Sequence, residues 1–203
     1  MSRAGIHVLE IVDAACDDAL ACQIVGLAAA LRAAGARVSA LCDHGLPAAA
    51  RLRDAGLDVL DAPLADSPRW RTVQVATAWI GQQRVGMLHA HGGGAHALGA
   101  LVGAITERPV LASIRDAAIP MLDLEAHRLG PWSHLALHHE GAFRQATTLG
   151  IAHARSTRVD DDPATTVGLL LRLATSGDSD AVGAWPPPST GGAADTVRLR
   201  EWR

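Results

Sequence analysis

The run HAHGGG at positions 89–94 is the most distinctive chemical feature of the sequence. It places two imidazoles at the end of an apolar segment, followed by three glycines whose backbone amides can approach a ligand closely. The same amides lead into a helical segment, and a helix N-terminus favours a phosphate or a carboxylate. We therefore expect His91, Gly92, Gly93 and Gly94 to form an anion or sugar pocket. Glycine-rich turns that serve only close packing are the alternative.

His89 and His91 could also bind a metal ion, because imidazoles two positions apart in a strand share one face. A metal site needs a third and a fourth ligand from elsewhere in the chain. His96 and the pair His138-His139 are the candidates, but nothing in the spacing brings them together. Metal-dependent amidohydrolases use such a pair in a barrel that this chain is too short to form. We therefore predict no metal site.

Other polar groups follow strands of the expected sheet. In an open α/β sheet, ligands bind at the carboxyl ends of the strands. That rule selects Asp13, at the start of the acidic segment 13–18, as a substrate-binding residue. It also selects the segment 43–45 and the pair Arg115-Asp116. Arg115 and Asp116 are candidate catalytic residues, with a local ion pair or a helix cap as the alternative.

Several familiar chemistries are excluded by what the sequence lacks. All 18 basic residues are arginines, so a lysine Schiff base and the phosphate-binding loop GxxxxGK[ST] cannot occur. The first strand is followed by DAACDD rather than GxGxxG, and three carboxylates there would repel a pyrophosphate. No GxSxG motif surrounds Ser113 or Ser133. We therefore expect no cofactor and no serine nucleophile.

Short apolar runs alternate with longer helical segments, which indicates repeated β-α-β units. The expected strands are 6–12, 37–42, 57–60, 85–90, 110–114 and 135–138. The expected helices are 19–34, 47–55, 70–83, 95–106 and 141–149. These units predict an α/β fold, a single Rossmann-like domain at 1–162 with a parallel sheet flanked by helices on both faces. A C-terminal helix is expected at 163–175, and the Gly/Pro-rich segment 176–203 is expected to be disordered.

The composition indicates which classes of binding partner and which cellular location to expect. The 203 residues carry a formal net charge of -3, which gives no support for binding nucleic acid or an acidic membrane. Cys16, Cys22 and Cys42 form no CxxC pair and are interpreted as reduced thiols. No segment has the roughly 18 continuous apolar residues of a membrane span, and the N-terminal apolar run is too short for a signal peptide. A cytoplasmic location is therefore expected.

Residues 6 to about 162 resemble the N-terminal domain of glycosyltransferase family 4, which has the GT-B fold. The resemblance rests on four segments in order: LAAALRAAGARVSAL (27–41), LRDAGLDVLDAPL (52–64), RVGMLHAHGGGAHALGALVGAITERPVLASIRD (84–116) and SHLALHHEGAFRQATTLGI (133–151). The segment RVDDDPA (158–164) follows where the family has a short motif before its second domain.

The resemblance implies an acceptor-binding half of a retaining enzyme that transfers a sugar from a nucleotide donor to a hydroxyl. It places His91, Gly92 and Gly93 at the cleft between two domains, with Arg115 and Asp116 where many relatives have a histidine near the reacting sugar. The sequence departs from the family in three ways. Acidic residues replace the glycine turn after the first strand, the usual serine near residue 139 is absent, and no donor domain follows residue 162.

Three hypotheses follow. The first is half of a glycosyltransferase, completed by a separate donor-binding chain. The second is a non-catalytic sugar- or partner-binding domain descended from that half. The third is an unrelated flavodoxin-like ligand binder. Because the face that normally contacts the second domain should be apolar, a homodimer or a heteromeric partner is also expected.

Overall fold

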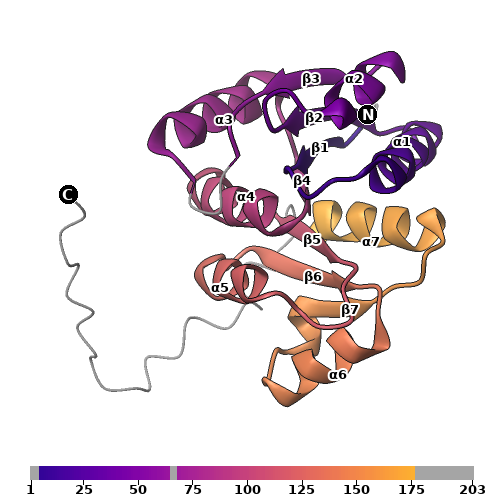
Figure 1. Ribbon diagram of the computed structural model, residues 1–203, viewed down its shortest axis with the longest axis vertical. Helices are drawn as coiled ribbons and strands as arrows, with labels where there is room; N and C mark the ends of the chain where they lie inside the picture. Colours follow the sequence, from indigo (N-terminus) through magenta and orange to yellow (C-terminus); the bar gives the residue numbers. More distant parts are fainter. Residues whose placement is uncertain (1–4, 65–67, 177–203) are drawn as a thin grey trace.

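The computed structural model describes residues 5–64 and 68–176 and shows one seven-stranded parallel sheet with helices on both faces (Figure 1). The strand order is β3-β2-β1-β4-β5-β6-β7. The strands are β1 (His7–Val12), β2 (Arg37–Cys42), β3 (Asp58–Asp61), β4 (Met87–His91), β5 (Val110–Ile114), β6 (Ser133–Leu137) and β7 (Ser156–Arg158). The α/β fold expected from the sequence is confirmed.

Two apolar clusters sandwich the sheet, one under each layer of helices. One face is covered by α1 (Asp18–Ala33), α2 (Pro47–Asp54) and α7 (Pro163–Ser176). The other is covered by α3 (Trp70–Gln83), α4 (Gly93–Thr106), α5 (Met121–Leu129) and α6 (Glu140–Thr148). Every residue of β1, β4, β5 and β6 is buried, as expected for strands covered on both sides.

Local sequence explains how the first β-α-β unit forms. Asp17 caps α1, where its carboxylate accepts a hydrogen bond from the Leu20 amide at 2.8 Å. The chain leaves α1 through Gly35, whose φ of 87° lies in the left-handed region. It then enters β2, which pairs in parallel with β1 from His7↔Arg37 onwards. The acidic start and the glycine end of this helix were both predicted from sequence.

The helix α7 belongs to the same core as the sheet. It follows the edge strand β7 but crosses back to lie beside α1, over the middle of the sheet (Figure 1). Its residues Val167, Leu169 and Leu170 are buried in the cluster that contains Val8 and Leu111. This helix therefore encloses whatever lies on that face of β1, β4 and β5.

The sequence analysis missed three short elements: α5, the 3-10 turn η1 (His153–Arg155) and β7. The strand β7 has three residues and only one neighbour, β6. The three-residue elements η1 and β7 carry too few residues for a hydrophobic period to be visible. The expected disorder of 176–203 lies almost entirely outside the described residues. In the part that the structure describes, no helix is long and apolar enough to cross a membrane.

Candidate functional site

The expected site lies where the order of the strands reverses. The chain moves outward from β1 to β2 and β3, then returns to place β4 on the other side of β1. Ligands of open α/β sheets bind at the carboxyl ends of the strands beside this point. A cavity of about 630 Å³ opens there. Its lining includes Asp13, Gln23, His91, Gly92, Gly93, Gly94, Ser113, Arg115, Asp116 and Asp123.

The structure thus brings all seven residues selected from the sequence to one cavity. A second cavity, of about 790 Å³, lies at the opposite edge, lined by residues such as Arg37, Arg84 and Arg108. It is larger, but it lies at the amino ends of the strands, away from the switch in strand order. We therefore build the site from the carboxyl edge.

Asp13 occupies the N-terminus of α4 with its own carboxylate. Oδ2 accepts hydrogen bonds from the amides of Gly94 at 2.9 Å and Ala95 at 3.3 Å. Oδ1 accepts from the amide of Ala15 at 2.9 Å. The carboxylate favoured at this helix N-terminus is therefore supplied by the chain itself. Burial raises the pKa of Asp13, and the three amide hydrogen bonds oppose that rise.

Gly92 is required by this arrangement. It has a φ of 98°, a region that side-chain-bearing residues rarely adopt. A Cβ at this position would also collide with the Asp13 carboxylate. The neighbouring Gly93 and Gly94 are already in the first turn of α4, which begins two residues earlier than the sequence suggested. The glycine run therefore lets Asp13 reach the helix.

Below the cavity floor, a carboxylate and two imidazoles meet on the face of the sheet under α1 and α7. Glu10 of β1 pairs in register with His89 of β4. Its Oε2 lies 2.7 Å from Nε2 of His91 and 2.8 Å from Nδ1 of His89. Glu10 and His89 are 0% exposed and His91 is 2% exposed. We call these three residues the Glu10 cluster.

The charges in the Glu10 cluster depend on one another. Burial alone would raise the pKa of Glu10, but the neighbouring His89 and His91 hold it at about 2. Burial and the adjacent His89 lower the pKa of His91 to about 4, against the pull of Glu10. The cluster at neutral pH is therefore a carboxylate facing a neutral His91 imidazole.

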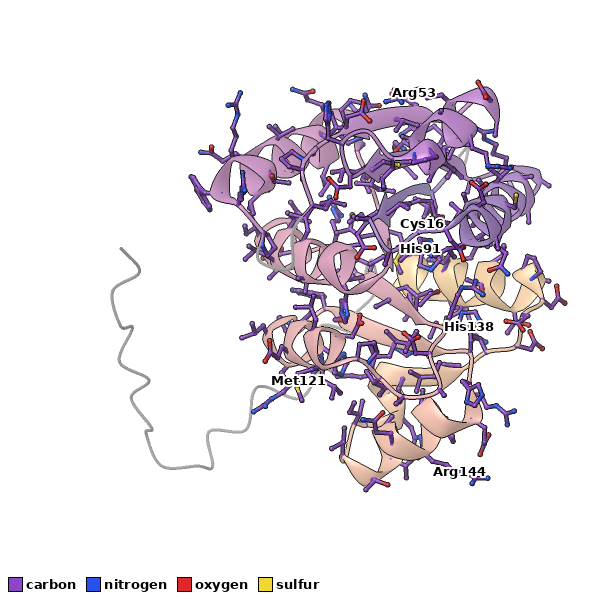
Figure 2. The ribbon with its side chains drawn as sticks, in the orientation of Figure 1. Cys16, Arg53, His91, Met121, His138 and Arg144 are labelled. Carbon is purple, nitrogen blue, oxygen red and sulfur yellow. The ribbon has the colours of Figure 1, made fainter. Side chains whose placement is uncertain are left out.

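A chain of polar side chains continues from this cluster towards the surface. Nε2 of His89 lies 2.8 Å from Oγ of Ser113, which is 3.5 Å from Nε2 of His138. Nδ1 of His138 lies 3.4 Å from Asp161. Burial and the nearby Arg115 lower the pKa of His138 to about 4. His91 and His138 both lie close to α7 (Figure 2).

Arg115 and Asp116 both lie at the cavity, but they do not pair with each other. Arg115 Nη1 is 3.7 Å from Asp161, in the acidic turn before α7. Asp116 is exposed in a bend, and no ion pair to it is found among the described residues. The alternative of a local Arg115–Asp116 ion pair is therefore wrong.

A second buried polar group, which the sequence analysis did not foresee, lies on the other face of the sheet. Nδ1 of His96 is 2.8 Å from Asp123, and Nε2 is 2.7 Å from Oγ of Ser133. The order Asp–His–Ser is that of a nucleophilic triad. Ser133 is completely buried and no substrate could reach it. We call this the His96 triad and assign it the role of holding α4, α5 and β6 together.

Two of the three cysteines, Cys16 and Cys42, do not offer a reactive thiol. Burial and Asp17 raise the pKa of Cys16 to about 11. Burial and Asp61 raise that of Cys42 to about 12. A thiol with such a pKa is protonated at neutral pH and is a weak nucleophile. The acidic neighbours of Cys16 therefore oppose its activation.

Glu10 is the main residue that the sequence analysis missed. Its signal was a carboxylate inside the apolar run IHVLEIV at 6–12. Charged residues are almost never fully buried without a partner, so this position called for one. The partners are 79 and 81 positions further along the chain, and only the pairing of β1 with β4 identifies them.

Solved structures with the same fold are found among sugar-nucleotide enzymes. A glycosyltransferase from Rickettsia africae has a TM-score of 0.62 at 11% identity, covering 77% of this chain and 43% of that chain. HepE from Anabaena, solved with UDP-glucose, has a TM-score of 0.61 at 13% identity, covering 77% and 44%. The UDP-GlcNAc 2-epimerase of Methanocaldococcus jannaschii has a TM-score of 0.58 at 12% identity, covering 89% and 52%.

These structures decide the fold. The chain has the fold of one Rossmann-like half of a GT-B protein. It spans about half or less of the length of each of the three proteins. No protein-family model and no curated protein sequence matches the chain. Because transferases and an epimerase share this fold, the fold of the GT-B half leaves the reaction to be argued from the site.

Proposed function

We propose that this GT-B half is the acceptor-binding side of a retaining, family-4-type glycosyltransferase. The sugar acceptor binds in the cavity at the carboxyl ends of β1 and β4. A nucleotide sugar is held by a donor half, on another chain or elsewhere in a longer protein. HepE was solved with UDP-glucose, which makes a sugar nucleotide the reasonable class of donor.

The carboxylate of Asp13 is the observation that carries this proposal. A nucleotide diphosphate bound at this edge needs the free amides of the α4 N-terminus. Here Asp13 already accepts hydrogen bonds from Gly94 and Ala95. A phosphate group would meet a carboxylate instead of a free helix end. An uncharged sugar with many hydroxyl groups can donate to that carboxylate, so the cavity suits an acceptor better than a donor.

Arg115 and Asp116 complete the proposed acceptor site. Arg115 has five N–H donors, and its long contact to Asp161 leaves most of them available for sugar oxygens. The exposed carboxylate of Asp116 can accept hydrogen bonds from sugar hydroxyls at the mouth of the cavity. The resemblance to family 4 suggests that this pair lies beside the sugar that is transferred.

The same edge offers apolar contacts for a partner half. Trp70 begins α3 and Met121 begins α5, and both helices start at the carboxyl edge of the sheet. These side chains are 67% and 69% exposed. Large exposed apolar side chains along one edge of a domain are typical of a docking surface. They support the proposal that a second half, or a second copy of this chain, closes the cavity.

Isothermal titration calorimetry tests the acceptor assignment. The wild-type chain is titrated with a panel of mono- and disaccharides and, separately, with nucleotide sugars. We expect a saccharide to bind and the nucleotide sugars not to bind. The variant Asp116→Asn should weaken saccharide binding about tenfold or more, because a hydrogen bond to a charged group contributes roughly 1.5–3 kcal/mol.

The matched control is Asp54→Asn, at the exposed end of α2 and outside the cavity lining. It should leave saccharide binding unchanged. Tight binding of a nucleotide sugar to the wild-type chain would mean that this half carries its own donor site. That result would overturn the proposed division between the two halves.

A further inference from the structure

The Glu10 cluster leaves polar atoms without partners in the core of the protein. Among the described residues, seven buried side-chain polar atoms lack a hydrogen bond. Three of them are Oε1 of Glu10, Nδ1 of His89 and Nδ1 of His91. Buried groups of this kind call for a partner, and a bound ion is a common one. Two of the three, Oε1 of Glu10 and Nδ1 of His89, are atoms that a bound cation can contact.

The hydrogen bond between His89 and Ser113 affects how Nδ1 of His89 faces Glu10. When Nε2 of His89 carries the ring proton and donates to Ser113, Nδ1 presents a lone pair to the Glu10 carboxylate. Without a proton or a cation between them, the two lone pairs repel each other at this separation of 2.8 Å. A cation between them would turn the repulsion into attraction.

We propose that the Glu10 carboxylate, Nδ1 of His89 and Nε2 of His91 bind one divalent transition-metal ion, Zn²⁺ or Fe²⁺. The ligand atoms of the three residues all lie within 4.8 Å of one another. Two imidazoles and one carboxylate form the donor set of open zinc sites and of non-haem iron sites. In register, β1 and β4 place Glu10 opposite His89, and Val12 opposite His91, so the sheet itself sets the geometry.

The surroundings of the cluster have the features of a metal site. Ser113 orients the far nitrogen of His89, as outer-shell partners of ligating histidines do. Metal binding would separate the three donor atoms by about 0.5 Å, since tetrahedral ligands about 2.0–2.2 Å from zinc lie roughly 3.3 Å apart. The rest of the chain contributes no fourth carboxylate, imidazole or thiolate to the cluster among the described residues. One coordination position therefore stays open.

An ion could reach the cluster from either of two cavities that His91 lines. This side chain lines the 630 Å³ cavity at the carboxyl edge. It also lines a smaller cavity of about 100 Å³ between α1, α7 and the sheet, together with Arg115, His138 and Asp161. The ion would thus lie directly beneath the proposed sugar cavity. The site goes beyond the acceptor assignment, because it can exist whether or not a sugar binds above it.

The first experiment measures metal binding by the purified full chain after treatment with a chelator. Zn²⁺, Fe²⁺ (without oxygen), Co²⁺ and Mg²⁺ are titrated separately by calorimetry. We expect one equivalent of each transition metal at low micromolar concentration or below, and no binding of Mg²⁺, which prefers oxygen ligands. The Zn²⁺ and Fe²⁺ titrations also show which ion binds more tightly. X-ray absorption at the zinc edge should show nitrogen and oxygen ligands at about 2.0–2.1 Å and no sulfur at about 2.3 Å.

Three variants locate the site. Glu10→Gln keeps the size of the side chain and should weaken Zn²⁺ binding more than about 100-fold. Ser113→Ala removes only the orienting partner of His89 and should weaken it about 10-fold. His44→Ala removes an exposed imidazole outside the cluster and should leave stoichiometry and affinity unchanged. Circular dichroism confirms that each variant is folded before it is titrated.

The wild-type absorption spectrum keeps the test decisive even if Glu10→Gln does not fold. Sulfur ligands in that spectrum would assign the metal to one or more of Cys16, Cys22 and Cys42 and overturn the proposal. Absence of stoichiometric binding by the wild-type chain would also overturn it, as would equal Zn²⁺ affinity in a folded Glu10→Gln. None of these outcomes depends on sugar binding, so the acceptor assignment is tested separately.

Discussion

The Glu10 cluster and the His96 triad contain similar groups and lie on opposite faces of the same sheet. Each combines a buried carboxylate with buried histidine, and each contacts one serine, Ser113 or Ser133. They differ in how fully their atoms are paired. Both ring nitrogens of His96 have close partners, at 2.8 Å and 2.7 Å. In the Glu10 cluster, three polar atoms have no hydrogen bond.

The difference separates a structural role from a functional one. A buried polar network whose atoms are all paired stabilises one arrangement of the core. The His96 triad joins α4, α5 and β6 on the opposite face of the sheet from the Glu10 cluster, and it satisfies that description. The Glu10 cluster lies beneath the expected site and leaves its bonding incomplete. Buried polar atoms without a hydrogen bond call for an explanation, and the proposed metal ion supplies one.

Lowering the pH should change the free energy of unfolding more than any substitution, because it protonates histidines at both clusters. The pKa values of His91 and His138 are lowered to about 4, and that of His127, beside the His96 triad, to about 3. Burial is the main cause in each case. The unfolded chain binds these protons near pH 6.5 and the folded protein does not. The stabilisation is therefore complete above about pH 6.5 and is lost as the pH falls towards 4.

Together with His134, whose pKa burial likewise lowers to about 4, these histidines give a slope of roughly 5 kcal/mol per pH unit in the free energy of unfolding over this range. Urea unfolding at a series of pH values measures this slope. Imidazole resonances followed by NMR report whether His91 and His138 become protonated at a higher pH than His127. A free energy of unfolding that stays constant from pH 7 to pH 4.5 would contradict the prediction.

Among the single substitutions, Asp123→Ala should destabilise the folded protein most. It leaves His96 buried without its carboxylate partner, and breaking a buried pair from one side costs about 3–5 kcal/mol. Denaturant unfolding measures the loss. Glu125→Ala, at an exposed position of the same helix, is the control and should change stability by less than about 0.5 kcal/mol. Zn²⁺ affinity should stay unchanged in a folded Asp123→Ala protein. A large drop in that affinity would remove the distinction between the two clusters.

Gly92→Ala should have a smaller effect, of about 2–3 kcal/mol. The substitution forces a side chain into a backbone region with positive φ and against the Asp13 carboxylate. Gly168→Ala is the matched control, because Gly168 lies in α7 with open space around its Cβ position. It should stabilise the protein by roughly 0.5–1 kcal/mol. Thermal unfolding measures whether the first variant is destabilised and the second stabilised. Equal changes in stability would show that the position of the Asp13 carboxylate does not require glycine at position 92.

The sequence by itself determined the fold class and the edge of the sheet where the site lies. Apolar runs of strand length, helix starts such as Asp17 and helix ends such as Gly35 are local signals, and they set nearly all the long elements within a few residues. The rule for open parallel sheets then brought Asp13, His91 and Arg115 to one cavity. The prediction of the fold succeeded because it needs only neighbouring residues and a general rule of topology.

The tertiary structure alone decided which side chains contact each other. The carboxylate of Asp13 reaches the amide of Gly94, 81 positions away, and Arg115 contacts Asp161 rather than the adjacent Asp116. Glu10 meets His89 and His91 because β4 pairs with β1, and a shift of one residue in that pairing would turn the side chains to opposite faces. No local pattern encodes that register, which depends on packing α4 and α7 against the two faces of the sheet. The positions of β1 and β4 could therefore be predicted from the sequence, whereas the contacts within the Glu10 cluster could not.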